Sequence, residues 1–186
     1  STATIVLASV DNASLAGYRL DIGISNADVE RRLLEQRLGP ASADSGWVPI
    51  AESFPCHIYA ESRTIWWGDI AFSFGRHRVH SPDDGTDSLE GWSVGVIDGF
   101  TVPILGSPAA PRVRVLLDGQ VDIGSSAADF YRFVQDSGYM YNMASPPTVG
   151  MVWGNSYFPV SMNIEDGRVV GFGVSPFECY DDTSGF

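Results

Sequence analysis

The sequence predicts an α+β fold of two similar halves, each with one helix followed by an antiparallel sheet. Residues 20–29 and 121–130 are identical at six of ten positions after a shift of 101, which indicates an internal repeat. In each half, one segment with helical periodicity precedes several short, apolar, strand-like segments. With 186 residues, 44% of them hydrophobic, and a mean hydropathy of +0.01, the chain can bury a core. These observations predict segregated helices and strands.

The repeated stretch is interpreted as a device that starts a helix in each half. Ser25 and Ser126 are placed to act as N-cap residues, with hydroxyls that accept a backbone N–H of the first turn. Asp28 and Asp129 follow three residues later, where a carboxylate can complete the cap and lie against the positive end of the helix dipole. Every repeated position has a folding role, so we expect scaffold here rather than a site.

The first helix is predicted over residues 26–38. Val29, Leu33, Leu34 and Leu38 recur at helical spacing and predict the buried face. Glu30, Arg31, Glu35 and Arg37 are expected on the exposed face. Gly39 and Pro40 then end the helix.

The strands of the first half are predicted from short apolar or alternating runs. They are expected at residues 3–10, 56–60, 64–67, 70–74 and 92–97. Residues 11–14 are predicted to form a turn and residues 80–87 an exposed polar loop.

The second half repeats this plan. It is predicted to contain a strand at 113–117, a helix at 127–135, and strands at 148–153, 157–163 and 169–174, with a hairpin turn at 165–167. Trp-Gly-Asp at 67–69 and Trp-Gly-Asn at 153–155 occupy matching turns. Prolines at 103, 108 and 111 place the boundary between residues 1–105 and 106–186. The two sheets are expected to form one continuous or concave sheet with the helices on one side.

The charge excludes several classes of function. The net charge is −12 and the chain contains no lysine. Nucleic acids and anionic membranes attract clustered positive charge, which this sequence lacks, and a P-loop or a Schiff base requires lysine. No apolar run approaches the ~20 residues that span a bilayer, so we expect no direct membrane insertion.

The cysteines bear on the compartment in which the protein works. Cys56 and Cys179 fall one in each half, and a bridge between them would close a loop of ~124 residues and stabilise the fold by about 4–5 kcal/mol. We favour this disulfide and a secreted or cell-envelope location, against the alternative of two buried thiols. The start at Ser1 fits either a processed secreted protein or a trimmed chain.

The repeat also resembles a known superfamily. Residues 22–29 (Ile-Gly-Ile-Ser-Asn-Ala-Asp-Val) followed by Leu38-Gly39-Pro40 are similar to the opening of the SmpA/OmlA outer-membrane lipoprotein and β-lactamase-inhibitor-protein superfamily. The Gly-Trp and Trp-Gly-Asp turns and the late cysteine resemble those of secreted actinobacterial proteins. The resemblance implies two tandem repeats that form one concave sheet. The inhibitor has a disulfide inside each repeat, whereas this chain has one cysteine per repeat, and none of the inhibitor's contact residues aligns with a motif here.

Four candidate chemical sites fit the sequence poorly. Ser93 lies in a Gly-x-Ser-x-Gly pattern, but strand-like residues follow it and every histidine precedes it, contrary to a nucleophile elbow. His77 and His80 are flanked by arginines and lack a third metal ligand. Cys56 and His57, as strand neighbours, point to opposite faces. The acids at 83, 84 and 87 lack an EF-hand pattern and are interpreted as a solvated turn. No catalytic residue, metal or cofactor is predicted.

Aromatic residues near sheet and turn positions are the predicted binding residues. Exposed tryptophan and tyrosine on a rigid sheet are typical of protein-binding hot spots, and the alternative for each ring is a place in the core. Trp66 and Trp67 are adjacent, so one ring is expected to face the helices and the other outward. The predicted binding residues are Trp66, Trp67, Trp92, Tyr139, Tyr141, Trp153 and Tyr157.

The sequence thus predicts a non-catalytic, extracytoplasmic protein-binding module that uses its sheet face. Such a module would act as an inhibitor or as an accessory subunit of an envelope complex. One alternative is a small hydrolase or ligand-binding enzyme with carboxylates in the groove between repeats. Another is a purely structural subunit. The sequence leaves the partner and the oligomeric state open.

Overall fold

A computed structural model gives the fold of the chain. It describes residues 3–9, 12–15, 18–21, 26–50, 59–78, 86–95, 113–117, 121–137, 140–142, 148–153 and 156–174. Side chains are described for residues 26–50, 59–78, 86–95, 121–136 and 162–173. Within these ranges the fold is α+β, with mostly antiparallel sheet and two helices, as the sequence predicts.

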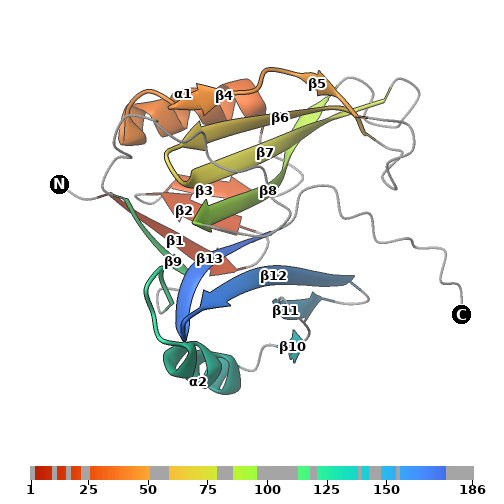
Figure 1. Cartoon of the computed structure of the whole chain (residues 1–186). Helices are drawn as coiled ribbons and strands as arrows, with labels where there is room; N and C mark the ends of the chain where they lie inside the picture. Colours follow the sequence, from red (N-terminus) through yellow and green to blue (C-terminus); the bar gives the residue numbers. More distant parts are fainter. Residues whose placement is uncertain are drawn as a thin grey trace, which may run out of the picture.

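Two sheets are present in the described part of the chain. The larger has nine strands in the order β10-β11-β12-β13-β8-β7-β6-β4, with β5 also paired to β6, and all its pairs are antiparallel. Its strands are β4 (Ala43–Asp44), β5 (Val48–Pro49), β6 (Tyr59–Trp67), β7 (Ile70–His77), β8 (Asp87–Gly95), β10 (Met140–Asn142), β11 (Thr148–Trp153), β12 (Ser156–Glu165) and β13 (Arg168–Val174). Figure 1 shows this sheet running from β4 and β6 at one end to β11 and β10 at the other.

The smaller sheet has the order β3-β2-β1-β9. It therefore brings the first strands of the chain next to a strand from residues 113–117. Its strands are β1 (Ala3–Ser9), β2 (Asn12–Leu15), β3 (Tyr18–Asp21) and β9 (Val113–Leu117). β1 pairs in parallel with β9. The turn predicted at residues 11–14 is wrong, because the β2 backbone pairs with β1 on one side and β3 on the other. Pairing on both sides outweighs the turn preference of asparagine.

The two helices lie at opposite ends of the larger sheet (Figure 1). The helix α2 (Ala127–Ser137) begins as predicted, because the Ser126 hydroxyl accepts from the Asp129 N–H at 3.1 Å and donates to the Asp129 carboxylate at 2.7 Å. The helix α1 (Ala27–Leu38) begins one residue later in the repeat. Its N-cap is Asn26, whose Oδ1 accepts from the N–H groups of the first turn at 3.1 and 3.3 Å. The N-cap role predicted for Ser25, which lies outside the described residues, therefore belongs to Asn26.

The buried face of α1 differs from the prediction. Ala27, Glu30, Leu34 and Leu38 are buried, whereas Val29 is 42% exposed. Positions 27, 30, 34 and 38 recur at the 3.6-residue helical period and therefore lie on one face of the helix. Burial of the leucines at 34 and 38 determines that this face packs against the sheet. Glu30 was expected to be exposed and Val29 buried, and both expectations are wrong.

One core packs against the helix-bearing face of the larger sheet. Trp67, Phe72, Phe74 and Phe172 are fully buried there. The same cluster receives leucines 34 and 38 from α1 and residues 130, 133 and 134 from α2. Alternation along β7, predicted from Ile-Ala-Phe-Ser-Phe, puts residues 70, 72 and 74 on this face. A single apolar core therefore connects β6, β7 and β8 with β12 and β13.

Within the larger sheet, the strands from residues 43–95 meet those from residues 140–174 where β8 pairs with β13. Gly95 pairs with Gly171, and Gly173 pairs with Ser93. Gly95 has a φ of +72°, and a Cβ on it would overlap the carbonyl oxygen of Val170. A Cβ on Gly173 would lie 2.5 Å from the carbonyl oxygen of Trp92. Close backbone packing between these strands thus requires glycine at both positions.

Most predicted strands and turns are confirmed. The turn after Trp67 has Gly68 at φ +65°, and the turn at 165–167 has Asp166 at +48° and Gly167 at +73°, as tight hairpins require. β8 begins at Asp87, five residues before the strand predicted at 92–97. Neither helix in the described part of the chain is long and apolar enough to cross a membrane.

Candidate binding site

The predicted binding tryptophans that the structure describes are buried. Trp67 is fully buried on the helix side, and its indole N–H donates to the Gly39 carbonyl at 2.9 Å. Trp66 lies on the opposite face and is 8% exposed, although one of the two rings was expected to face outward. Trp92 is 3% exposed and packs edge-on against Phe172, 6.1 Å between ring centroids. These three rings are packed in the interior, so the surface described below is built without them.

The other predicted residues are placed only in part. Tyr141, Trp153 and Tyr157 lie on β10, β11 and β12, and their side chains fall outside the described residues. Tyr139 lies wholly outside them, as do the cysteines at 56 and 179. The binding role predicted for these tyrosines and for Trp153, and the disulfide, stay predictions.

Two of the sequence-derived chemical candidates have definite places. Ser93 lies within β8 and is 8% exposed, a strand context unlike a nucleophile elbow. Asp87 does not lie in a solvated turn as predicted. It begins β8, and its carboxylate accepts from the Ala27 N–H at 2.7 Å and from the Asn26 amide at 2.6 Å. A carboxylate at a helix N-terminus interacts favourably with the helix dipole, so Asp87 stabilises the contact between the start of α1 and strand β8.

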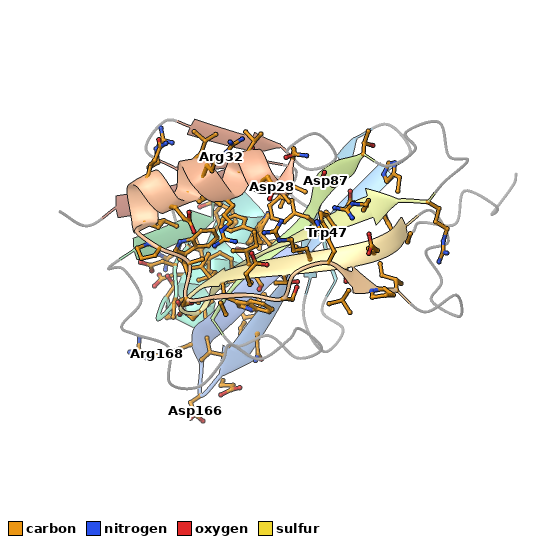
Figure 2. All side chains as sticks on the ribbon, turned by 90° about the horizontal axis from the view of Figure 1, so that it is seen from above. Asp28, Arg32, Trp47, Asp87, Asp166 and Arg168 are labelled. Atoms are coloured by element: carbon orange, nitrogen blue, oxygen red, sulfur yellow. The ribbon has the colours of Figure 1, made fainter. Side chains whose placement is uncertain are left out.

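A surface with aromatic and charged side chains lies beyond the N-terminal end of α1, on the same face of the sheet. Arg76 is two residues beyond the buried Phe74, and its strand neighbours in register are Glu61 and Asp87. In the view of Figure 2, Asp28, Trp47 and Asp87 lie toward the same end of α1, and Arg63 contacts both Asp28 and Trp47. We call this surface the Trp47 platform. It consists of Asp28, Asp44, Trp47, Glu61, Arg63 and Arg76.

Arg63 is the centre of the platform's ion pairs. It is 9% exposed and donates to both oxygens of the Asp44 carboxylate at 2.9 and 2.7 Å, and to Asp28 at 2.8 Å. Arg31 also donates to Asp44, at 2.6 Å. The hydrogen bonds from Arg63 hold the pKa of Asp44 below its ordinary value, against the effect of burial. This bidentate pair fixes the geometry of both side chains.

Trp47 carries a guanidinium on its ring. The Arg76 guanidinium lies 4.0 Å from the Trp47 ring centroid, and that of Arg63 lies 6.0 Å away. Both distances are within the range of cation–π attraction. Arg76 also pairs with Glu61 at 2.7 Å, while the indole packs against the core. Trp47 is therefore held in place from several sides.

Two exposed apolar side chains adjoin the platform. Val48, next to Trp47 on β5, is 46% exposed, and Val29, next to Asp28 on α1, is 42% exposed. The Asp28 side chain is 74% exposed. Tryptophan and arginine dominate protein-binding hot spots because they bury large surfaces and make directional contacts. The arrangement can thus contact another protein with little loss of side-chain entropy.

A second cluster of polar side chains lies directly behind the platform, on the other face of the sheet. The Ser88 hydroxyl donates to the Glu90 carboxylate at 2.5 Å, and the Tyr59 hydroxyl is hydrogen-bonded to the same group. The rings of Tyr59 and His77 lie 5.0 Å apart. Burial raises the pKa of Glu90 above its ordinary 4.5, although the hydrogen bonds and His77 oppose this. Burial and then the bond to Glu90 raise the pKa of Tyr59. We call this the Glu90 cluster (Tyr59, His77, Ser88, Glu90).

Replacing Glu90 with glutamine is expected to stabilise the protein at pH 7. Because the folded state raises the pKa of Glu90, its contribution to stability is present below pH 4.5 and is lost as the pH rises through the folded-state pKa. The glutamine variant does not titrate. We therefore expect its melting temperature to exceed that of the wild type at pH 7 and to converge with it near pH 4. Glu165→Gln, at an exposed hairpin position, is the control. Equal melting temperatures at pH 7 would contradict this prediction.

Two further findings concern metal ligands and similarity to known proteins. Among the described residues, no three His, Cys, Asp or Glu side chains gather as metal ligands do. Comparisons with protein-family models, curated proteins and solved structures found no match to the chain. The resemblance to the inhibitor superfamily therefore stays a prediction.

Proposed function

We propose that the chain is a non-catalytic protein-binding module and that the Trp47 platform is its contact surface. The observation that carries this proposal is the fixed Trp47 ring with Arg76 at 4.0 Å, next to Val48, which is 46% exposed. Among the described residues, large exposed hydrophobic side chains are otherwise found at Val29 and Ile123. Of these three exposed side chains, Val29 and Val48 adjoin the platform.

The charges of the platform support a protein partner over an ionic one. Arg63 and Arg76 pair with the three carboxylates at 28, 44 and 61, so the surface carries charges of both signs. Mixed charges around an apolar and aromatic centre are typical of protein interfaces, with a hydrophobic core and a polar rim. The net charge of −12 favours a partner with a basic surface, which it would attract over long range.

We further propose that the fold consists of two α+β repeats, residues 1–105 and 106–186, which share one concave sheet. The strand order supports this. Reading outward from the β8–β13 pair, the strands follow as β7, β6 and β4 on one side and as β12, β11 and β10 on the other. A helix that begins in the repeated sequence precedes each set. Such duplication provides a rigid scaffold for an inhibitor or an accessory subunit.

An extracytoplasmic location and a Cys56–Cys179 bridge belong to the same proposal. Three successive antiparallel pairings separate β6 from β13, so β6 begins at the end of the sheet where β13 finishes. Cys56 precedes β6 by three residues and Cys179 follows β13 by five. Peptide mass mapping without reductant is expected to recover one cross-linked peptide pair that contains both cysteines. Two free thiols in protein purified from its native compartment would contradict the bridge and the location.

Capture of a partner tests the proposed function. Wild-type protein immobilised as bait is expected to retain a protein from the secreted or envelope fraction of the source organism. Trp47→Ala and Arg76→Ala should each weaken binding by about 30-fold, because a hot-spot residue contributes about 2 kcal/mol. Calorimetry with the purified partner measures the change.

Matched surface variants control this experiment. Ile123→Ala removes an exposed apolar side chain away from the platform, and Arg132→Ala removes an exposed arginine from α2. Both should bind as the wild type does. A partner that binds Trp47→Ala and Arg76→Ala with wild-type affinity would refute the platform as the contact surface.

A further inference from the structure

The Glu90 cluster and the Trp47 platform lie on opposite faces of the strands β6 and β7, and the cluster also includes residues of β8. Along β7, His77 of the cluster follows Arg76 of the platform. Along β8, Ser88 of the cluster follows Asp87, which fastens α1. Neighbouring residues on a strand point to opposite faces, so a backbone shift that moves one group moves the other.

Glu90 lies at an irregularity of the sheet. The pairing of β7 with β8 shifts between Ser73 and Phe74, whose partners are Gly91 and Leu89, so Glu90 is the extra residue of a β-bulge. Bulges redirect side chains and occur next to functional sites. Here the carboxyl group of the bulge residue accepts hydrogen bonds from the hydroxyls of Ser88 and Tyr59.

Two chains of contacts connect this carboxyl group to the platform. One runs from Glu90 to Ser88 at 2.5 Å, then through the adjacent Asp87 to the Ala27 N–H at 2.7 Å, at the start of α1. The helix continues the chain, because Asp28 pairs with Arg63 at 2.8 Å. The other runs from Tyr59 to His77, 5.0 Å between ring centroids, and through the adjacent Arg76 to Trp47 at 4.0 Å.

We infer that Glu90 is a proton-sensitive element that controls the arrangement of the Trp47 platform. The inference rests on the proposed function, since it assigns a regulation to the surface proposed there. Among the described residues, the groups that face Glu90 are Tyr59 on β6, His77 on β7 and Ser88 on β8. When the carboxyl group loses its proton, a charge is left in a partly buried place beside the Ser88 and Tyr59 hydroxyls. Water must then reach the bulge, and the strands that carry Arg76 and Asp87 shift with it.

This mechanism predicts that binding through the platform is strongest when Glu90 is protonated. Burial raises the pKa of Glu90, while the hydroxyls of Ser88 and Tyr59 lower it by donating to the carboxylate. Removing either hydroxyl should therefore keep Glu90 protonated to a higher pH. Removing the carboxylate should abolish the transition.

The test follows the indole N–H signal of Trp47 by NMR over pH 4–9, with the signal assigned from its loss in Trp47→Phe. The wild type is expected to show a transition that is absent in Glu90→Gln. The midpoint should move to higher pH in Ser88→Ala and in Tyr59→Phe. His77→Gln should keep the transition, which would show that the transition comes from Glu90 and not from the neighbouring ring.

Three results would overturn the inference. They are a Trp47 signal that does not change with pH in the wild type, a transition of unchanged midpoint in Glu90→Gln, and an unchanged midpoint in Ser88→Ala. The serine variant keeps the test decisive if the glutamine variant does not fold. Glu165→Gln is the control and should titrate as the wild type does. Because no partner is needed, these results are independent of the capture experiment, which alone tests the proposed function.

Discussion

Gly95→Ala is expected to lower the free energy of unfolding by about 3 kcal/mol, because two costs add at this position. A φ of +72° is unfavourable for alanine by about 1–2 kcal/mol. The new Cβ would also overlap the Val170 carbonyl oxygen on the neighbouring strand β13, and overpacking costs about 1–3 kcal/mol. Urea denaturation measures the loss.

Gly167→Ala is the matched control for this prediction. Gly167 has a φ of +73°, nearly that of Gly95, but nothing lies within 4 Å of the position that a Cβ would take. Its cost should therefore be the conformational part alone, about 1–2 kcal/mol. The difference between the two variants reports the close packing of β8 on β13. Equal losses would show that the two halves of the sheet do not approach as closely as described.

Arg63→Met is expected to cost about 2–3 kcal/mol and to loosen the platform. Removing one partner of a buried pair leaves the other charge uncompensated, which costs about 3–5 kcal/mol. The loss here should be smaller, since Asp44 keeps its bond to Arg31 at 2.6 Å and Asp28, 74% exposed, is solvated. Urea denaturation again gives the value.

A double-mutant cycle checks the physical reason for that loss. Asp44→Asn combined with Arg63→Met should cost less than the sum of the single changes, because the second change removes the charge that the first left unpaired. Arg132→Met, at an exposed pair with Asp129 3.5 Å away, should cost almost nothing. Additive losses at 44 and 63 would show that this pair does not hold the platform together.

The elements that depend on local chemistry could be predicted from the sequence. Ser126 and Asp129 form the predicted cap because both groups lie within one helical turn. Asp166 and Gly167 form the predicted hairpin, since their residue types accept positive φ. The predicted alternation along β7 is confirmed, since residues 70, 72 and 74 share the core face, although the residues between them are buried on the other face.

The candidate site depends on contacts between distant residues, and these left little trace in the sequence. Asp87 looked like part of a polar loop because its role requires α1, 60 residues away along the chain. Trp47 was missed, although a tryptophan between Gly46 and Val48 in an otherwise small and polar segment is a usable signal. Arg63 and Arg76 lie on strands, and only the register of β6 with β7 shows that they share a face with Trp47.

Photo-cross-linking identifies the part of the surface that touches the partner. A photoreactive residue is placed at Val48, beside Trp47, or at Ile123, which is similarly exposed at 40% but lies in the other half of the chain. The account predicts that the derivative at position 48 links to one discrete partner protein, that excess wild type competes and Trp47→Ala does not, and that position 123 gives no such product. Equal yields from both positions, or a product from position 123 alone, would contradict the claim that this protein binds its partner through the Trp47 platform.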